Sequence, residues 1–278
     1  SLGADDYIIK PFFVDELKKK VSNMLKIKER EEIYNRLYSI DTVMESNLLS
    51  KIKMIEHTQL EIIMRLGKAA EFRDDETGRH IERVSDYVKL IAEHMGMNKE
   101  EVSLVYFASP MHDVGKIGIP DSILLKPSVL TEQEFNIVRL HTIIGGKILG
   151  GTALPLLEMA KEIALSHHER WDGDGYPHNL NRDYIPLSGR IVAIADVFDA
   201  LTSHRVYKSP WSIEKAFDYI KQQRERQFDP QIVDAFFDLS DKIINIKETK
   251  IDTITTKPII YELLDGTISF QELIEMWR

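Results

Sequence analysis

Two adjacent histidines followed by a glycine-rich segment are the part of this sequence best suited to chemistry. His167 and His168 can supply two imidazoles to one metal centre, and residues 169–177 follow them directly. Two glycines in this segment, Gly173 and Gly175, allow positive φ angles, and its final proline fixes one φ. The segment is therefore expected to be a shaped loop, and the pattern predicts a metal site with a substrate-binding loop beside it.

Other residues of metal-binding type recur on successive segments that are expected to be helices. Most stand next to apolar sequence, which would bring them to the centre of a packed helical bundle. These candidates are Glu76, His80, His112, Asp113, His141 and Asp196. A lone histidine at a helix end is more often structural, and a lone buried aspartate is more often a cap or an ion-pair partner. The number of such residues in this chain favours a metal centre.

Three of the polar residues have specific expected roles. Asp113, next to a histidine, can bridge two cations while the imidazole holds one of them. Asp196 lies in an apolar run, where a buried carboxylate needs a counter-charge, and a metal is the simplest one. Lys116 follows one turn after Asp113 and is a candidate to contact a phosphate or to protonate a leaving oxygen. The alternative for Lys116 is a surface lysine at a helix end.

The composition limits the possible chemistry. The 278 residues include no cysteine, so disulfides and thiolate metal sites are excluded, and nitrogen and oxygen ligands favour iron, manganese, zinc or magnesium. The lack of cysteine also fits a reducing compartment, and a cytoplasmic location is expected. A net charge of −9 argues against binding to a nucleic acid polymer. No apolar run reaches the ~18 residues of a membrane span.

The expected organisation begins with a long helix. Residues 14–66 contain neither glycine nor proline, and apolar residues recur there at every third or fourth position. The narrow apolar stripe favours a linker or signalling helix that forms a parallel coiled coil, and hence a homodimer, over a helix packed on its own domain. Residues 67–245 are expected to be a nearly all-helical catalytic domain, and residues 246–278 a C-terminal extension.

Local signals predict where several helices of the catalytic domain begin. Asn98 with Glu101, and Thr131 with Glu134, have the spacing of capping boxes. Asp229 precedes a proline, which is typical of an N-cap followed by the first helical residue.

The N-terminal residues 1–25 resemble the last strand and helix of a response-regulator receiver domain. Residues 7–9 are expected to be the strand, and Lys10-Pro11 follows it. The resemblance implies an upstream receiver or sensor domain in a longer regulator.

A second and larger resemblance covers residues 66–245. The series Glu76-x3-His80, His112-Asp113-x2-Lys116, His141, His167-His168, Gly175-Tyr176-Pro177 and Asp196 resembles the HD-GYP branch of the HD phosphohydrolases. The resemblance implies an all-α, HD-type helical bundle and an enzyme that hydrolyses cyclic di-GMP to pGpG and on to GMP. It also implies two or three divalent metals, most often iron, with manganese as the alternative.

The resemblance assigns a role to each matching residue. His80, His112, Asp113 and Asp196 match the core ligands, His141, His167 and His168 match the ligands of the second metal, and Glu76 matches a ligand of a third. Arg205 and Lys208 resemble the residues that bind the second phosphate or a guanine, if the helix carrying Asp196 continues that far. The loop residues Gly175, Tyr176 and Pro177 are expected to contact substrate. Asp199 is expected either to accept from a guanine edge or to orient a ligand.

The chemistry can also be argued from the residues alone. Two cations held by His and Asp side chains would supply a hydroxide nucleophile at neutral pH, with Asp113 and Lys116 as the catalytic residues. Two alternatives remain open at this point. One is an HD phosphohydrolase that acts on another nucleotide, and the other is a non-catalytic cyclic di-GMP sensor.

Overall fold

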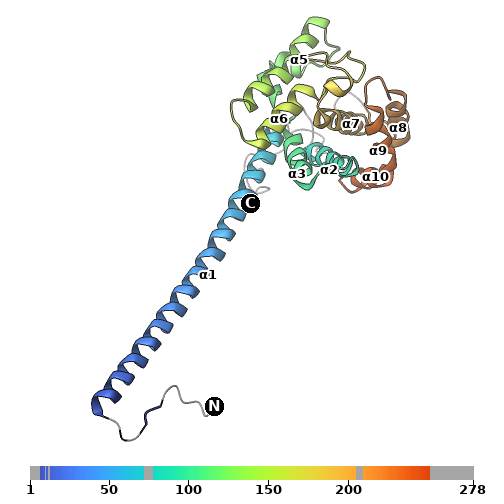
Figure 1. Ribbon diagram of the computed structural model, residues 1–278. Coiled ribbons are helices and arrows are strands. Elements are labelled where there is room, and N and C mark those ends of the chain that lie inside the picture. Colours follow the sequence, from blue (N-terminus) through green and yellow to red (C-terminus); the bar gives the residue numbers. More distant parts are fainter. Residues whose placement is uncertain (1–6, 10, 12, 72–77, 205–208, 251–278) are drawn as a thin grey trace, which may run out of the picture. The chain divides into compact units, whose positions relative to one another are not determined.

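The computed structural model describes residues 7–9, 11, 13–71, 78–204 and 209–250 of the chain (Figure 1). Within these ranges every regular element is a helix, and the only β-type pairing is an isolated bridge between Arg224 and Phe228. The all-α fold predicted from the sequence is confirmed. The chain divides into two compact units, residues 1–59 and residues 60–278.

The longer helices are α1 (Val14–Glu71), α2 (Gly78–His94), α3 (Lys99–Ala108), α5 (Glu132–Leu149), α6 (Pro155–Ser166), α7 (Leu187–Thr202), α8 (Ile213–Gln222), α9 (Pro230–Asp238) and α10 (Ser240–Thr249). The shorter ones are η2 (Ser109–Met111), η3 (Val114–Gly118), α4 (Asp121–Leu124) and η4 (Arg182–Tyr184).

The helix starts predicted from capping signals are confirmed. The Asn98 side chain accepts from the backbone of Glu101, whose own side chain accepts from the backbone of Asn98. Thr131 and Glu134 form the same reciprocal pair at the start of α5. The Asp229 side chain caps α9. Each pair satisfies amide groups that a helix leaves without intrahelical partners.

Helix α1 runs without interruption for 58 residues, through Gly67 and five residues past the boundary expected at residue 66. In residues 14–59 its large apolar side chains are mostly exposed, for example Leu25 (63%), Leu37 (60%) and Leu48 (59%). The described part of the chain therefore leaves this stripe uncovered.

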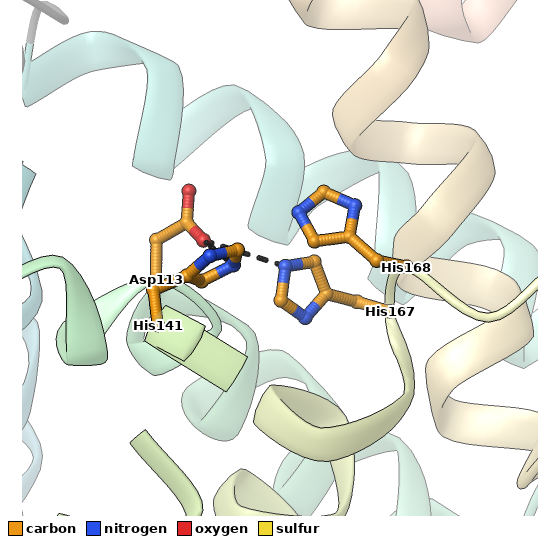
Figure 2. Close-up of side chains that lie close together, drawn as sticks. All are labelled: Asp113, His141, His167 and His168. Carbon is orange, nitrogen blue, oxygen red and sulfur yellow. Dashed lines mark ion pairs between the residues drawn. The ribbon is translucent and has the colours of Figure 1, made fainter. Parts of the chain in front are cut away.

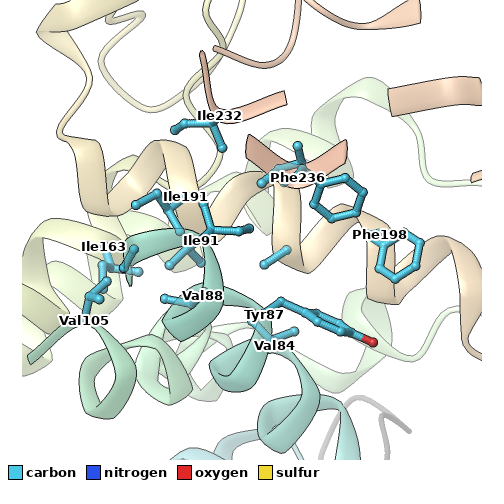
Figure 3. Close-up of a cluster of buried hydrophobic side chains, with 14 of the residues drawn as sticks. Val84, Tyr87, Val88, Ile91, Val105, Ile163, Ile191, Phe198, Ile232 and Phe236 are labelled. Carbon is cyan, nitrogen blue, oxygen red and sulfur yellow. The ribbon is translucent and has the colours of Figure 1, made fainter. Parts of the chain in front are cut away.

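The core of the second unit lies where α2, α6, α7 and α9 meet (Figure 3). Tyr87 of α2 and Phe198 of α7 pack edge to face, with ring centroids 5.5 Å apart. Burial of a large apolar side chain of this kind contributes about 1.5–3 kcal/mol. The core thus fixes the positions of two helices. Helix α2 carries His80 and Arg83, and helix α7 carries Asp196 and Asp199.

Close backbone contact fixes the position of η3 against α5. A Cβ atom on Gly115 would collide with the carbonyl oxygen of His141 and with the backbone nitrogen of Gly145. Only glycine permits this approach, so the segment that follows Asp113 lies directly beside the turn of α5 that carries His141.

Three expectations need correction. Residues 7–9 do not form a strand, because no other described strand pairs with them. Helix α10 continues to Thr249, past the expected boundary at residue 245, and Lys247 in this added part donates a 2.6 Å hydrogen bond to Ser203. Helix α7 ends at Thr202, so it does not continue to Arg205 and Lys208, which lie outside the described residues.

None of the helices in the described ranges has both the length and the hydropathy that a membrane span requires.

Candidate metal centre

Four histidines of the second unit are oriented through the same ring nitrogen. Nδ1 of His112, His141 and His167 lies 2.9, 2.7 and 3.0 Å from a backbone carbonyl oxygen on the same helix or turn. Nδ1 of His80 lies 2.8 Å from Oδ2 of Asp199. Carbonyl and carboxylate oxygens only accept hydrogen bonds, so each Nδ1 carries a proton and Nε2 is the nitrogen left to bind a metal.

The Nε2 atoms are buried and point inward. Those of His112, His141 and His167 have no hydrogen-bond partner among the described residues. Leaving buried polar atoms without partners is costly, so the arrangement fits a bound cation. The oxygen and nitrogen donors suit a first-row divalent metal.

One group of possible ligands consists of Asp113, His141, His167 and His168, whose ligand atoms all lie within 4.8 Å of one another. Figure 2 shows the three imidazoles around the Asp113 carboxylate. Oδ1 of Asp113 lies 3.1 Å from Nε2 of His141 and 3.3 Å from Nε2 of His167. The start of η3, helix α5 and the end of α6 thus converge on one carboxylate oxygen.

The second group consists of Glu71, His80 and His112, with Asp196 beside it. Oδ1 of Asp196 lies 3.4 Å from Nε2 of His80 and 3.8 Å from Nε2 of His112. Oδ2 of Asp113 lies 3.4 Å from Nε2 of His112. Asp113 therefore faces one group with each of its oxygens, which is the position that a bridging ligand needs.

Burial and the charges in the site lower some of its pKa values and raise that of His112. Burial alone would raise the pKa of Asp113, but Lys116, His112 and His141 hold it well below its ordinary value. Burial would lower the pKa of His112, but Asp113 and Asp196 outweigh burial and raise it to about 9. Burial lowers the pKa of His167 and, together with His167, holds that of His168 well below its ordinary value. Asp113 is thus a carboxylate and His168 a neutral imidazole, the forms that bind metal.

Asp199 lies in the interior and its side chain is completely buried. It contacts His80 and accepts hydrogen bonds of 2.6 and 2.7 Å from Arg83. Burial would raise the pKa of Asp199, but Arg83 and His80 hold it well below its ordinary value. This position favours the orienting role over contact with a guanine edge, the two roles that the sequence left open.

Lys116 is almost fully buried, and its Nζ lies 2.8 Å from Oδ2 of Asp113. Its ammonium group therefore belongs to the site, and the interpretation as a surface lysine is wrong.

The loop after α6 brings Tyr176 to the site. The Tyr176 ring stacks on the His168 ring, with centroids 4.8 Å apart. Glu169 holds the loop closed, because its carboxylate accepts backbone hydrogen bonds of 2.7 Å from His178 and 2.9 Å from Leu180. Gly175 is required here, because a Cβ atom would lie 2.5 Å from Cα of Glu169. Pro177 follows Tyr176 in the same loop.

The structure adds two residues that the sequence analysis missed. Glu71 ends α1, and the sequence offers no local signal that it lies near His80. Arg139 is an exposed cation two residues before His141, with its guanidinium carbon 5.1 Å from the centroid of the Tyr176 ring. Its spacing from His141 on one helix was the only available signal. Glu76, like Arg205 and Lys208, lies outside the described residues.

The fold and these groups define a helical domain with a His/carboxylate metal centre. The family model described as "HD domain" matches residues 63–232, and the chain belongs to this family. The predicted membership of the HD family is confirmed. Members of this family are metal-dependent phosphohydrolases, which agrees with the two groups of possible ligands.

Several curated proteins are similar over most of the chain. "Cyclic di-GMP phosphodiesterase response regulator RpfG" of Xanthomonas campestris is 44% identical over 84% of this chain. "Cyclic di-GMP phosphodiesterase" of Thermotoga maritima is 42% identical over 91%. "3'3'-cGAMP-specific phosphodiesterase 2" of Vibrio cholerae is 43% identical over 78%. The chain spans 61%, 70% and 41% of the length of these relatives, respectively.

A solved structure supports the fold. The crystal structure of a cyclic GMP-AMP-specific phosphodiesterase of Vibrio cholerae (V-cGAP3) aligns with 68% of this chain and 50% of its own, with a TM-score of 0.52 and 19% identity.

Proposed function

We propose that this chain is a metal-dependent phosphodiesterase that hydrolyses cyclic di-GMP. The observation that carries the proposal is the position of Asp113 between two groups of histidines. Each of its carboxylate oxygens faces Nε2 atoms of a different group. The names of relatives that are 42–44% identical support the substrate.

The residues present fit two divalent cations, with His141, His167 and His168 around one and His80, His112 and Asp196 around the other. Asp113 is shared by both. When bound, such cations activate a water molecule at neutral pH and offset the negative charge of a phosphodiester. Iron is the proposed metal and manganese the alternative, as the resemblance to the HD-GYP branch implies, and the nitrogen and oxygen donors are compatible with both.

We propose a third ion that depends on Glu76, as in the family that the sequence resembles. The Glu76→Ala variant should lose about one metal per chain and keep the others, as measured by elemental analysis. Unchanged stoichiometry would reject the third ion.

Lys116 and the loop supply the remaining chemistry. The ammonium group of Lys116, held against Asp113, is placed to neutralise a phosphate oxygen or to give a proton to the departing O3′. Tyr176 offers a ring that can stack on a base and a hydroxyl that can donate to a phosphate. Gly175 and Pro177 give this loop its shape.

The second phosphate of the substrate needs cations beyond the metal centre. Arg205 and Lys208 remain the proposed contacts from the sequence. Arg139, beside Tyr176, is a further exposed guanidinium and suits a phosphate, because it can form two parallel hydrogen bonds. Hydrolysis of one phosphodiester gives pGpG, and a second turnover gives GMP.

The competing substrate is 3'3'-cGAMP, because one relative named for that activity is 43% identical. The test is to load metal-free protein with Fe²⁺ without oxygen, or with Mn²⁺, and incubate it with cyclic di-GMP, 3'3'-cGAMP and cyclic di-AMP. Chromatography of the products should show pGpG or GMP from cyclic di-GMP, formed faster than products from the other two. Faster cleavage of 3'3'-cGAMP would identify it, and not cyclic di-GMP, as the preferred substrate. Tight binding of cyclic di-GMP without turnover would favour the sensor alternative.

We also propose the wider organisation expected from the sequence. Residues 14–66 join two chains as a coiled coil and transmit a signal to residues 67–245. The exposed apolar side chains of α1 support this proposal. An upstream receiver or sensor domain, of which residues 1–25 are the end, remains a proposal based on resemblance alone.

A further inference from the structure

Glu71, the last residue of α1, is the carboxylate in the second group that neither the motifs nor the spacing indicated. Only 1% of its surface is exposed. One oxygen, Oε1, lies 3.7 Å from Nε2 of His80, and a ligand atom of Glu71 lies within 4.8 Å of those of His80 and His112.

Two contacts hold the end of α1 in this position. A Cβ atom on Gly67 would lie 2.6 Å from the carbonyl oxygen of Pro110, so α1 is pressed against η2, which directly precedes His112. One residue further on, Nζ of Lys68 lies 2.6 Å from Oε1 of Glu82 on α2. The position of Glu71 is thus fixed by packing from both the segment before His112 and the helix that carries His80.

The hydrogen bonds of the His80 and His112 rings determine which ring nitrogen of each faces Glu71. His80 and His112 each have Nδ1 hydrogen-bonded to an oxygen, so the Nε2 atoms face the space that Glu71 approaches. Nε2 of His112 is buried and has no hydrogen-bond partner in the described part of the chain. One carboxylate oxygen and two imidazole nitrogens, all from buried residues, thus lie within 4.8 Å of one another, close enough to bind a single cation.

We propose that Glu71 is a ligand of the divalent metal held by His80, His112 and Asp196, so that the linker helix itself completes this half of the centre. The inference rests on the proposed metal-dependent function. It also means that metal bound at this half holds the end of α1 against the domain.

The test uses the whole chain, stripped of metal and titrated with Mn²⁺, which is followed by electron paramagnetic resonance of the free ion. The Glu71→Gln variant keeps the size of the side chain and removes its charge. It should weaken one Mn²⁺ site at least tenfold and leave the tightest remaining site unchanged. Glu61→Gln is the matched control, because it makes the same substitution on the same helix at a side chain that is 51% exposed and pairs with Arg65.

Thermal unfolding separates a ligand from a structural residue. If Glu71 binds metal, the rise in Tm on adding Mn²⁺ should be smaller in Glu71→Gln than in wild type, because the variant binds the ion more weakly. A lower Tm in the metal-free state with an unchanged rise would overturn the inference.

Two outcomes of the titration would also be decisive. Equal Mn²⁺ binding by Glu71→Gln and wild type would overturn the role of Glu71 alone and leave Glu76 as the carboxylate that matters. A wild-type chain that binds no Mn²⁺ and no Fe²⁺ would overturn the proposed function, and the inference with it.

Discussion

At the scale of single residues, the site is defined by where protons lie on imidazole rings. His112, His141 and His167 each give their Nδ1 proton to a carbonyl oxygen of their own helix or turn, so the backbone that positions each ring also sets its tautomer. His80 uses the Asp199 carboxylate instead. A carboxylate partner makes an imidazole a stronger base, and hence a stronger ligand, than a carbonyl partner does.

The role of His112 can be tested against a histidine outside the site. The His112→Ala variant should lose at least about 100-fold in turnover and about one metal per chain, because it removes a proposed ligand of one of the two cations that Asp113 bridges. Asp113→Ala should do the same. His94→Ala is the control, because His94 is 40% exposed and contacts only Asp238 among the interactions seen here. Full activity in His112→Ala would show that His112 is not a ligand of a metal required for turnover.

Asp199 gives a second residue-scale prediction. Asp199→Asn removes the counter-charge of the fully buried Arg83, which should lower the free energy of unfolding by about 3–5 kcal/mol. It should also weaken metal binding at His80. Denaturant unfolding of the metal-free protein and a metal titration would measure both effects. If Asp199 instead contacted substrate, KM would rise while stability and metal affinity stayed as in wild type. Asp238→Asn, at an exposed carboxylate, is the matched control.

At the scale of the elements, the helices were predictable where the signal is local. Three such signals act within a few residues: the caps at Asn98 and Thr131, the absence of glycine and proline from residues 14–66, and the spacing of Lys116 from Asp113. The motif also indicated which histidines meet. Glu71 was not predictable, because its position depends on α1 packing against η2 and α2. The orienting role of Asp199 was undecided for the same reason: its partners Arg83 and His80 lie on another helix.

The packing of η3 on α5 gives an element-scale prediction. Gly115→Ala would push η3 away from the backbone at His141 and separate Asp113 from that histidine. We expect turnover to fall more than tenfold and Tm to fall by several degrees, since backbone atoms cannot move aside as side chains can. Gly118→Ala is the control in the same helix, because its Cβ would meet only the flexible side chain of Ile144, 2.9 Å away. Equal effects of the two variants would show that this contact does not hold the site together.

At the scale of the whole molecule, the chain combines a folded metal-binding unit with a helix whose first part has no apolar cover in the described chain. The unit from residue 60 onward contains its own core. Residues 14–59 place leucines, isoleucines and methionines on the surface of one continuous helix. Because Glu71 ends this same helix, we propose that a change in how two helices pair is transmitted to this carboxylate, whose Oε1 lies 3.7 Å from Nε2 of His80.

Removal of residues 1–59 should therefore convert a dimer into a monomer, as measured by light scattering after size-exclusion chromatography. Truncation alone does not distinguish a coiled coil from another contact, so single substitutions are needed in the whole chain. Leu37→Lys and Leu48→Lys place charges on the apolar stripe and should weaken the dimer at least tenfold. Lys53→Glu changes a charge on the opposite side of the helix and should leave the dimer intact. A truncated chain that remains dimeric, or stripe variants that behave like Lys53→Glu, would place the contact between chains elsewhere and leave the stripe of α1 without its proposed role.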